Sequence, residues 1–403
     1  MSSSCIFYLC RINSYIDQSR FGYDLHIGPA YQKLIHVSKA LRSAGTRVSL
    51  VAVPVCNELK IKDAKINTVV SRERGVRIIS LGAIPGRVLS RIYASVAFLA
   101  FVIRCVREKD RVIIYNFFPE YILATLYLFF RKRRAILDIE DAPRADESGL
   151  VSVVTRVSFS ILRFLCKREC ITVSTKIAEK FQLQNPLVVY GASPPSSNNR
   201  SILHADFKNN TKSIGTVRVL YGGSMLPETG LNIFCAAVEI LVEKNVHPKF
   251  NLELLVTGFG GDFELGVISK FKFPSWLQLN IKQDLDFSSY EALLRSGHIG
   301  LCLKVPGTSM ADTTFPSKVV EIIRSGLLLI TTPTSDVPLL FDENQIIQIQ
   351  QPYANALASI LFEIANAPYE FIDVADAGII RADELFSYPG VGRRMQEWLN
   401  LIH

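Results

Sequence analysis

Residues 315–332, FPSKVVEIIRSGLLLITT, form the most informative stretch of the sequence and predict a short helix followed by a buried strand. Pro316 suits the first turn of a helix and Gly326 suits its end. Lys318 then lies in the first helical turn, where the helix dipole disfavours a cation, and a bound phosphate would remove that conflict. Glu321, three residues later on the same face, could accept hydroxyl hydrogen bonds from a ribose or a sugar. An ordinary surface ion pair is the alternative interpretation of Lys318 and Glu321.

Strand and helix patterns alternate on both sides of this stretch, which is typical of parallel sheets covered by helices on both faces. The alternation runs through residues 1–195, stops at a polar segment over 196–216, and restarts over 217–380. A helical tail follows over 381–403. The sequence therefore predicts an α/β protein with two doubly wound, Rossmann-like domains that face a cleft and are joined by a linker. Ligands in such sheets bind at the carboxyl ends of the strands.

Two further strand-to-helix turns carry small residues at such ends. Residues 222–230, GGSMLPETG, come directly after a strand and directly before a helix. Small side chains let a ligand approach the backbone, and the helix N-terminus favours an anion. Gly28 and Pro29 open the helix after the first strand in the same manner. An ordinary surface loop is the alternative at both places.

Carboxylates occur at the end of one strand and in one D-x-D pair. Asp138, Glu140 and Asp141 lie in DIEDAP at a strand end, where a general base would be placed; capping of the next segment is the alternative. Asp284 and Asp286 form a pair of the kind that can hold a metal on a sugar nucleotide. A capping box follows them directly, so we expect helix capping and no metal site.

Charge is unevenly distributed along the 403 residues. Residues 1–200 hold 30 Lys and Arg against 15 Asp and Glu, whereas residues 201–403 hold 15 against 22. A basic half suits nucleic acid, an anionic membrane surface or an anionic substrate. Residues 151–167 predict a basic amphipathic helix, with Arg131–Arg134 nearby in sequence, which favours the membrane surface over nucleic acid. A docked helix with a solvated basic edge is the alternative.

Several other classes of protein are disfavoured. The most apolar stretch is shorter than the ~20 residues that span a bilayer, and the N-terminus does not read as a signal peptide. The eight cysteines are scattered, which predicts reduced thiols. No G-x-G-x-x-G follows the first strand, which argues against a nicotinamide enzyme. We therefore expect a cytoplasmic protein, peripheral at the cytoplasmic face of the membrane.

Taken together, these residues resemble the GT-B glycosyltransferases, especially the group 1 class that includes glycosyltransferase family 4. Residues 219–230 resemble the strand and Gly-rich loop of that class, and residues 252–260 resemble its next strand, which ends in G-x-G. Residues 290–303 resemble its helix–strand step. Residues 315–332 resemble its most specific segment, in a Pro-Ser-Lys form. The resemblance covers nearly the whole chain.

The resemblance implies a hexosyltransferase that uses a nucleotide diphosphate sugar as co-substrate and needs no cofactor and no metal. It implies that 217–380 binds the donor, that 1–195 binds the acceptor, and that 381–403 packs back on the first domain. Lys318 would meet the departing diphosphate and act as a catalytic residue, and Glu321 would meet the ribose. The implied donor-binding residues are Gly28, Gly222, Gly223, Ser224, Thr313, Ser317, Lys318 and Glu321.

Some positions depart from that class. Ser224 and Thr229 stand where its Gly-rich loop has a basic pair, and Thr313 stands where an E-x7-E motif begins. The Pro-Ser-Lys form also resembles the inverting β-mannosyltransferases of lipid-linked oligosaccharide assembly. Retention and inversion therefore both stay open, and for inversion Asp141 or Glu140 is the candidate catalytic base.

Three functions follow as hypotheses. The first is transfer of a sugar from a UDP- or GDP-linked donor to a saccharide or lipid-linked saccharide, in cell-surface polysaccharide or glycolipid biosynthesis at the cytoplasmic membrane face. The second is a non-catalytic GT-B subunit or scaffold of a glycosyltransferase complex, motivated by Ser224, Thr229 and Thr313. The third is a GT-B epimerase that acts on the nucleotide sugar itself.

Overall fold

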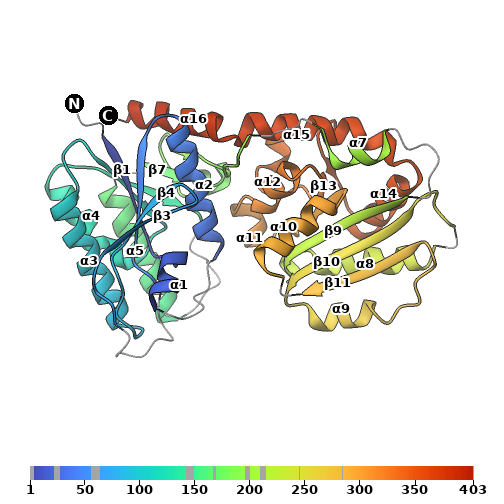
Figure 1. Cartoon of the computed structure of the whole chain (residues 1–403), viewed down its shortest axis with the longest axis horizontal. Helices are drawn as coiled ribbons and strands as arrows, with labels where there is room; N and C mark the ends of the chain where they lie inside the picture. Colours follow the sequence, from blue (N-terminus) through green and yellow to red (C-terminus); the bar gives the residue numbers. More distant parts are fainter. Residues whose placement is uncertain are drawn as a thin grey trace. The chain divides into compact units, whose positions relative to one another are not determined.

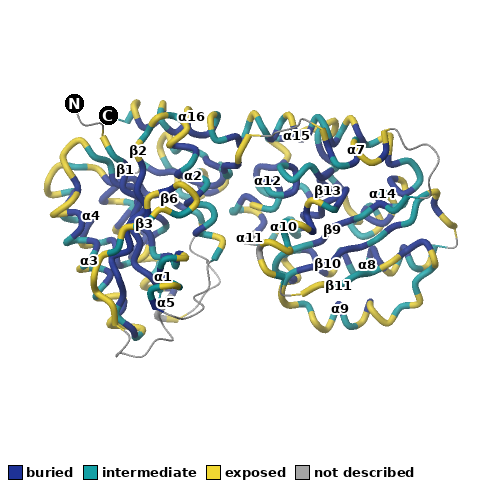
Figure 2. The backbone as a smooth tube through the Cα atoms, in the orientation of Figure 1, coloured by how far each residue is buried: buried dark blue, intermediate teal, exposed yellow. Residues whose placement is uncertain are grey.

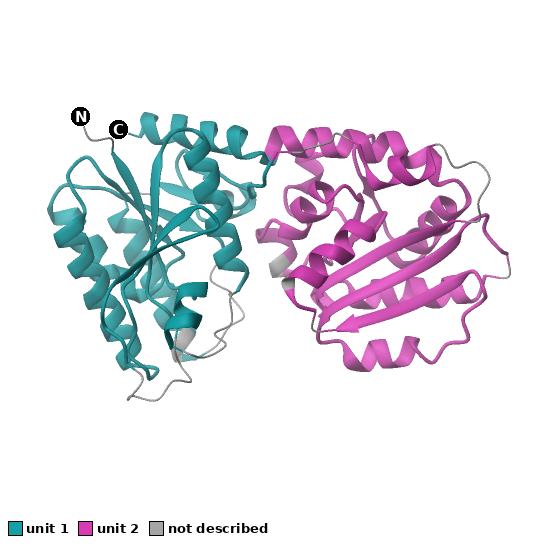
Figure 3. Ribbon diagram, in the orientation of Figure 1, with its two compact units in different colours: residues 1–194, 386–403 teal, residues 195–385 magenta. Residues whose placement is uncertain are grey.

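The chain divides into two compact units (Figure 3). Unit 1 comprises Met1–Pro194 and Phe386–His403, and unit 2 comprises Pro195–Leu385. Unit 1 is therefore assembled from both ends of the sequence. The computed structural model describes residues 4–21, 28–55, 64–141, 149–166, 169–195, 200–208, 215–244, 246–283 and 285–402.

Unit 1 is built on an eight-stranded sheet in the order β3-β4-β2-β1-β5-β6-β7-β8 (Figure 1). Its strands are β1 (Cys5–Cys10), β2 (Arg47–Ala52), β3 (Val69–Glu73), β4 (Val76–Ser80), β5 (Arg111–Tyr115), β6 (Ala135–Ile139), β7 (Cys170–Thr172) and β8 (Leu187–Val188). Neighbouring strands pair in parallel except for β3 and β4. These two form an antiparallel hairpin over Arg74 and Gly75, which both have positive φ, as two-residue hairpin turns require. The expected parallel sheet therefore has one antiparallel edge.

Helices cover both faces of this sheet because side chains alternate along each strand. Along β1, Phe7 and Leu9 enter the core beneath α3, α4 and α5, whereas Ile6 and Tyr8 enter the core beneath α2 and α16. Figure 2 shows the central strands, such as β1, as mostly buried, whereas the edge strand β3 is partly exposed. Its helices are α1 (Tyr15–Phe21), α2 (Pro29–Ser43), α3 (Leu89–Cys105), α4 (Ile122–Phe130), α5 (Leu150–Leu165), α6 (Thr175–Lys180) and α16 (Tyr388–Leu401), with a short 3-10 helix at Pro119–Tyr121.

The C-terminal helix α16 belongs to unit 1 because it packs closely on α2. Val391, Met395 and Trp398 lie in the same core as α2. A Cβ added at Gly392 would lie 1.9 Å from the carbonyl oxygen of Ala40, so only glycine allows this approach. The indole nitrogen of Trp398 donates a hydrogen bond to the carbonyl oxygen of Asn185, at 2.9 Å.

We expect Gly392→Ala to destabilise unit 1 by about 2 kcal/mol, because the new methyl group must push α16 away from α2. Each unit holds one tryptophan, Trp398 in unit 1 and Trp276 in unit 2. Urea unfolding followed by the fluorescence of Trp398, in a Trp276→Phe background, measures the effect on unit 1. Gly266→Ala is the matched control, because Gly266 also lies in a helix but a Cβ there meets nothing within 4 Å. Equal unfolding midpoints for the two variants would contradict the close contact.

Unit 2 is built on a six-stranded, all-parallel sheet in the order β11-β10-β9-β12-β13-β14. Its strands are β9 (Thr216–Ser224), β10 (Asn251–Phe259), β11 (Leu277–Gln283), β12 (Ile299–Cys302), β13 (Leu328–Thr331) and β14 (Ile347–Gln348). Its helices are α7 (Ile202–Phe207), α8 (Leu231–Val242), α9 (Asp262–Ile268), α10 (Phe287–Ser296), α11 (Ser309–Thr313), α12 (Ser317–Arg324), α13 (Val337–Leu340), α14 (Tyr353–Asn366) and α15 (Ile372–Phe386), with 3-10 helices at Pro227–Thr229 and Pro368–Phe371. Helices α8 and α14 share one core with the sheet. Helix α12 lies on the other face, where Ile322 fills the space beside Gly300.

The structure corrects the linker expected over 196–216. Ile202–Phe207 forms the helix α7, which Ser201 caps, and its Leu203 and Phe207 are buried in the unit 2 core. The imidazole Nδ1 of His204 lies 2.5 Å from a carboxylate oxygen of Asp376, which ties α7 to α15. Polar composition misled the prediction because two apolar side chains are enough to anchor so short a helix. The helical tail predicted over 381–403 begins later than expected, because α15 extends to Phe386 and α16 begins at Tyr388.

Candidate functional site

Helix α12 places Lys318 as the sequence predicted. The helix begins directly after Pro316, which fixes the backbone at its start, and Lys318 is its second residue. The Lys318 ammonium lies 2.6 Å from a carboxylate oxygen of Glu321, one turn along the helix. Both side chains are about one third exposed, so the pair is reachable from solvent.

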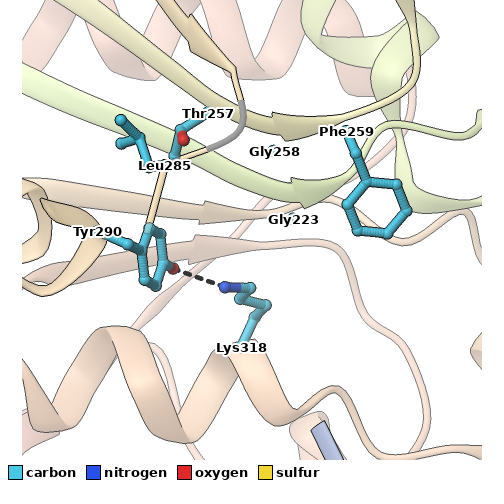
Figure 4. Close-up of a pocket in the computed structure, with 7 residues that line it drawn as sticks. All are labelled: Gly223, Thr257, Gly258, Phe259, Leu285, Tyr290 and Lys318. Carbon is cyan, nitrogen blue, oxygen red and sulfur yellow. Dashed lines mark hydrogen bonds between the residues drawn. The ribbon is translucent and has the colours of Figure 1, made fainter. Parts of the chain in front are cut away.

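Tyr290 completes this group, and sequence reasoning missed it. Lys318 donates a hydrogen bond of 2.6 Å to the phenol oxygen of Tyr290 (Figure 4). The ammonium also lies 4.4 Å from the centre of the Tyr290 ring, within the range of a cation–π contact. Tyr290 comes from α10, and the pattern that predicted this helix does not show which of its side chains reaches α12. The only sequence signal was its place at the start of the 290–303 helix–strand step.

A pocket of about 250 Å³ opens beside Lys318 (Figure 4). It lies at the carboxyl ends of β9 and β10, with α10 and α12 contributing one side chain each. This is where ligands bind in open α/β sheets. Its lining residues are Gly223, Thr257, Gly258, Phe259, Leu285, Tyr290 and Lys318.

Glycine is required at the base of this pocket. Gly258 has a φ of +143°, and a Cβ there would lie 1.8 Å from the carbonyl oxygen of Gly223. Gly223 has a φ of +119°, and a Cβ there would lie 3.3 Å from Cε of Lys318. A Cβ at Gly222 would meet Thr257 and Tyr290 at 3.3 and 3.5 Å. The backbone of β9 and β10 is therefore bare where it faces the pocket, so a ligand can approach it directly.

The electrostatics of the pocket favour an anion. Burial disfavours the ammonium of Lys318, but the Glu321 carboxylate and Tyr290 outweigh it and raise the pKa of Lys318. Burial raises the pKa of the Tyr290 phenol to about 12, so this group stays neutral at physiological pH. A fixed cation in the first turn of a helix supplies positive potential where the helix dipole already favours negative charge.

The other predicted donor residues lie outside the described pocket lining. Ser224 is the last residue of β9, and its carbonyl oxygen accepts a 2.7 Å hydrogen bond from the Thr229 hydroxyl. That hydroxyl also accepts from the Leu226 backbone nitrogen at 2.9 Å, so Thr229 stabilises its own loop. Thr313 ends the short helix α11, and Ser317 is the exposed first residue of α12.

In unit 1, the carboxylates predicted at a strand end lie around a lysine that sequence reasoning did not single out. The Lys33 ammonium lies 3.6 Å from a carboxylate oxygen of Asp138 and 3.8 Å from one of Glu140. Asp138 is buried and accepts a short hydrogen bond from the Tyr8 hydroxyl. Lys33 belongs to α2, and its position on that helix places its side chain against β6 rather than in solvent. Asp138 is thus a structural anchor.

The two candidate bases differ in their surroundings. Glu140 is half-buried, and its backbone nitrogen donates a 2.8 Å hydrogen bond to the Asn116 side chain. Burial raises the pKa of Glu140, the Lys33 cation lowers it, and the nearby Asp141 raises it, with a net upward shift. Asp141 is exposed. Glu140 therefore has the fixed position and the perturbed pKa that a proton-accepting group requires.

The structure describes some of the remaining predicted positions. Gly28 precedes Pro29, the first residue of α2, as expected, whereas residues 22–27 lie outside the described part of the chain. Asp286 caps α10, accepting from the Ser289 backbone nitrogen at 2.7 Å, which confirms its predicted capping role. Asp284 lies outside the described residues. Among the residues that the structure describes, no group of three or more His, Cys, Asp or Glu could hold a metal ion.

Comparison with known proteins identifies the fold. No protein-family model and no curated protein matches the sequence. Sucrose-phosphate synthase from Thermosynechococcus elongatus superposes with a TM-score of 0.63 at 13% identity, covering 99% of both chains. HepE from Anabaena, solved with UDP and glucose, superposes with a TM-score of 0.63 at 12% identity, covering 99% of this chain and 100% of that one. The UDP-forming α,α-trehalose-phosphate synthase from Burkholderia xenovorans superposes with a TM-score of 0.62 at 11% identity, covering 98% of this chain and 100% of that one. The chain thus has the GT-B glycosyltransferase fold, which confirms the predicted fold class.

Proposed function

We propose that this chain is a glycosyltransferase that moves a sugar from a nucleoside diphosphate sugar to a saccharide acceptor. The observation that carries the proposal is Lys318, held by Tyr290 and Glu321 beside a pocket with a bare glycine backbone. This site lies in a GT-B fold, whose solved examples include HepE in complex with UDP-glucose. The same chemistry suits this pocket: a diphosphate beside the lysine and the start of α12, and a ribose beside Glu321.

Catalysis in this proposal is mostly electrostatic. Charge develops on the diphosphate as the glycosidic bond breaks, and a preorganised cation stabilises that charge more than it stabilises the bound donor. We propose that Lys318 has this role and that the reaction needs no metal and no further cofactor. Glu140 accepts the proton of the acceptor hydroxyl, which implies inversion at the anomeric carbon.

We also propose that the acceptor is carried by a lipid and that transfer takes place at the cytoplasmic face of a membrane. The basic first half of the chain supports this location, since it suits an anionic membrane and an anionic acceptor. The Pro-Ser-Lys motif supports it as well, because it resembles enzymes that extend lipid-linked oligosaccharides. Within its described residues, the chain has no helix long and apolar enough to cross a membrane.

The donor is identified by a thermal-shift panel with UDP, GDP, ADP and CMP. We expect one diphosphate to stabilise unit 2, by about 2.7 kcal/mol at a concentration one hundred times its dissociation constant. UDP would point to hexoses, their N-acetyl forms or uronic acids, and GDP to mannose or fucose. Glu321→Gln should weaken that binding, because it removes the carboxylate proposed to hold the ribose.

A non-catalytic subunit is the second candidate. It is favoured by the absence of a basic pair at Ser224 and Thr229, where the Thr229 hydroxyl is engaged within its own loop. A folded protein that responds to none of the four nucleotides and copurifies with another glycosyltransferase would support this function and contradict the transferase.

A further inference from the structure

One layer of unit 1 exposes apolar side chains that its own core does not use. Helices α3, α4 and α5 already bury one face of each against the sheet. Each also exposes large aliphatic or aromatic residues on its outer side, at helical spacing. These are Leu89, Ile92, Val96 and Ile103 of α3, Leu123 and Phe130 of α4, and Val153, Val154, Val157, Ile161 and Phe164 of α5. Helices with two apolar faces are expected to bury both, so we expect this outer face to bind a partner.

Phe130 and Phe164, the most exposed residues of this face, form an aromatic tip together with the partly buried Phe129. The Phe129 ring lies 6.1 Å from the ring of Phe130 and 6.1 Å from the ring of Phe164, which joins the C-terminal ends of α4 and α5. Phe130 is 74% exposed and Phe164 is 72% exposed. Large aromatic side chains at two neighbouring helix ends are suited to insertion into an apolar phase.

Basic residues lie close to the tip in sequence. Residues 100–134, which cover the C-terminal end of α3 and all of α4, contain eight Lys or Arg against three Asp or Glu. Exposed members of this set are Arg104, Arg107, Lys109, Arg131, Lys132 and Arg134. On α5, Arg156 is exposed and donates to the Ser152 hydroxyl at 2.9 Å. Lys167, the last residue of the basic helix predicted over 151–167, lies outside the described residues.

We propose that the outer face of α3, α4 and α5 binds an anionic lipid bilayer, with Phe130 and Phe164 inserted and the nearby cations on the headgroups. The proposal rests on the membrane location given under the proposed function and assigns it to one surface of unit 1. Charge complementarity selects this occupant, because aromatic residues bordered by cations match the boundary between headgroups and acyl chains. A protein partner for the same face would have to match both an apolar stripe and a strongly basic border.

The test is sedimentation of the full chain with vesicles, at low and at high salt. We expect binding to vesicles of equal parts phosphatidylcholine and phosphatidylglycerol, and little binding to phosphatidylcholine alone. Phe130→Ser with Phe164→Ser should weaken binding about tenfold or more, because the variant lacks the two rings that the bilayer would bury. Arg131→Ala with Lys132→Ala should weaken it about 25-fold, at about fivefold for each cation at an anionic surface.

Matched controls lie in unit 2. Phe263→Ser removes a phenylalanine that is 80% exposed on α9, and Lys270→Ala with Lys272→Ala removes two exposed lysines. Neither should change vesicle binding. Equal binding to both vesicle types, or equal loss in the unit 1 and control variants, would overturn the proposal.

Two further readouts separate the possible failures. A wild-type oligomer that ignores vesicles and dissociates in the Phe130→Ser, Phe164→Ser variant would assign the face to a protein interface and overturn the membrane proposal. The nucleotide thermal shift, measured on the same variants, reports donor binding, which does not use the outer face of α3, α4 and α5. Vesicle binding without any nucleotide response would contradict the transferase function but not the membrane-binding surface. A nucleotide response without vesicle binding would contradict only the membrane-binding surface.

Discussion

Lys318→Ala is expected to lower the rate of sugar transfer about 100-fold, the usual effect of removing one donor that stabilises a departing oxyanion. The reason lies in the arrangement of α12. Tyr290 and Glu321 hold the ammonium in one place before the donor arrives, so no reorganisation is needed as charge develops. The measurement is single-turnover transfer at saturating donor, once the thermal-shift panel has named the nucleotide.

Two controls separate this role from a structural one. Lys270→Ala removes an exposed lysine of the same unit and should leave transfer unchanged. Tyr290→Phe keeps the ring beneath the ammonium but removes the phenol oxygen, so its rate should lie between those of the wild type and Lys318→Ala. The Lys318 side chain is partly exposed, so its loss should change unfolding little. Normal turnover in Lys318→Ala would remove this residue from the mechanism.

The structure also indicates which parts of this site a sequence can predict. Lys318 was predictable because Pro316 and Gly326 fix both ends of α12, and the position of a residue in a helix is a local property. Tyr290 was not, because its contact with Lys318 depends on how α10 and α12 pack across the sheet.

The same limit applies in unit 1. The strand-end position of Glu140 was predictable from the order of residues along β6. The contact with Lys33 was not, since it joins α2 to a strand about one hundred residues further along the chain. The linker prediction failed for a related reason, because two buried side chains determine the position of α7. Local patterns thus predicted the elements, whereas pairs formed across elements required the structure.

The choice between Glu140 and Asp141 as the catalytic base follows from one of those pairs. Lys33 bridges Glu140 to Asp138, which is fixed by Tyr8, so the Glu140 carboxylate has a defined position. Asp141 is exposed, and no comparable anchor holds it among the described contacts. A proton acceptor must be placed within hydrogen-bond reach of the acceptor hydroxyl, which favours the fixed group.

Glu140→Gln is therefore expected to lower transfer about 1,000-fold, within the range for loss of a general base, with the fold and nucleotide binding retained. The pH dependence of kcat/KM provides the sharper test. A base works deprotonated, so activity falls as the pH drops through the pKa of Glu140, which burial raises above its usual range. Lys33→Met removes the cation that lowers this pKa and should move the acidic limb to higher pH, whereas Asp141→Asn removes a like charge and should move it to lower pH. A purely structural role for Lys33 would change the rate without these opposite shifts, and an unaltered rate in Glu140→Gln would exclude this carboxylate as the base.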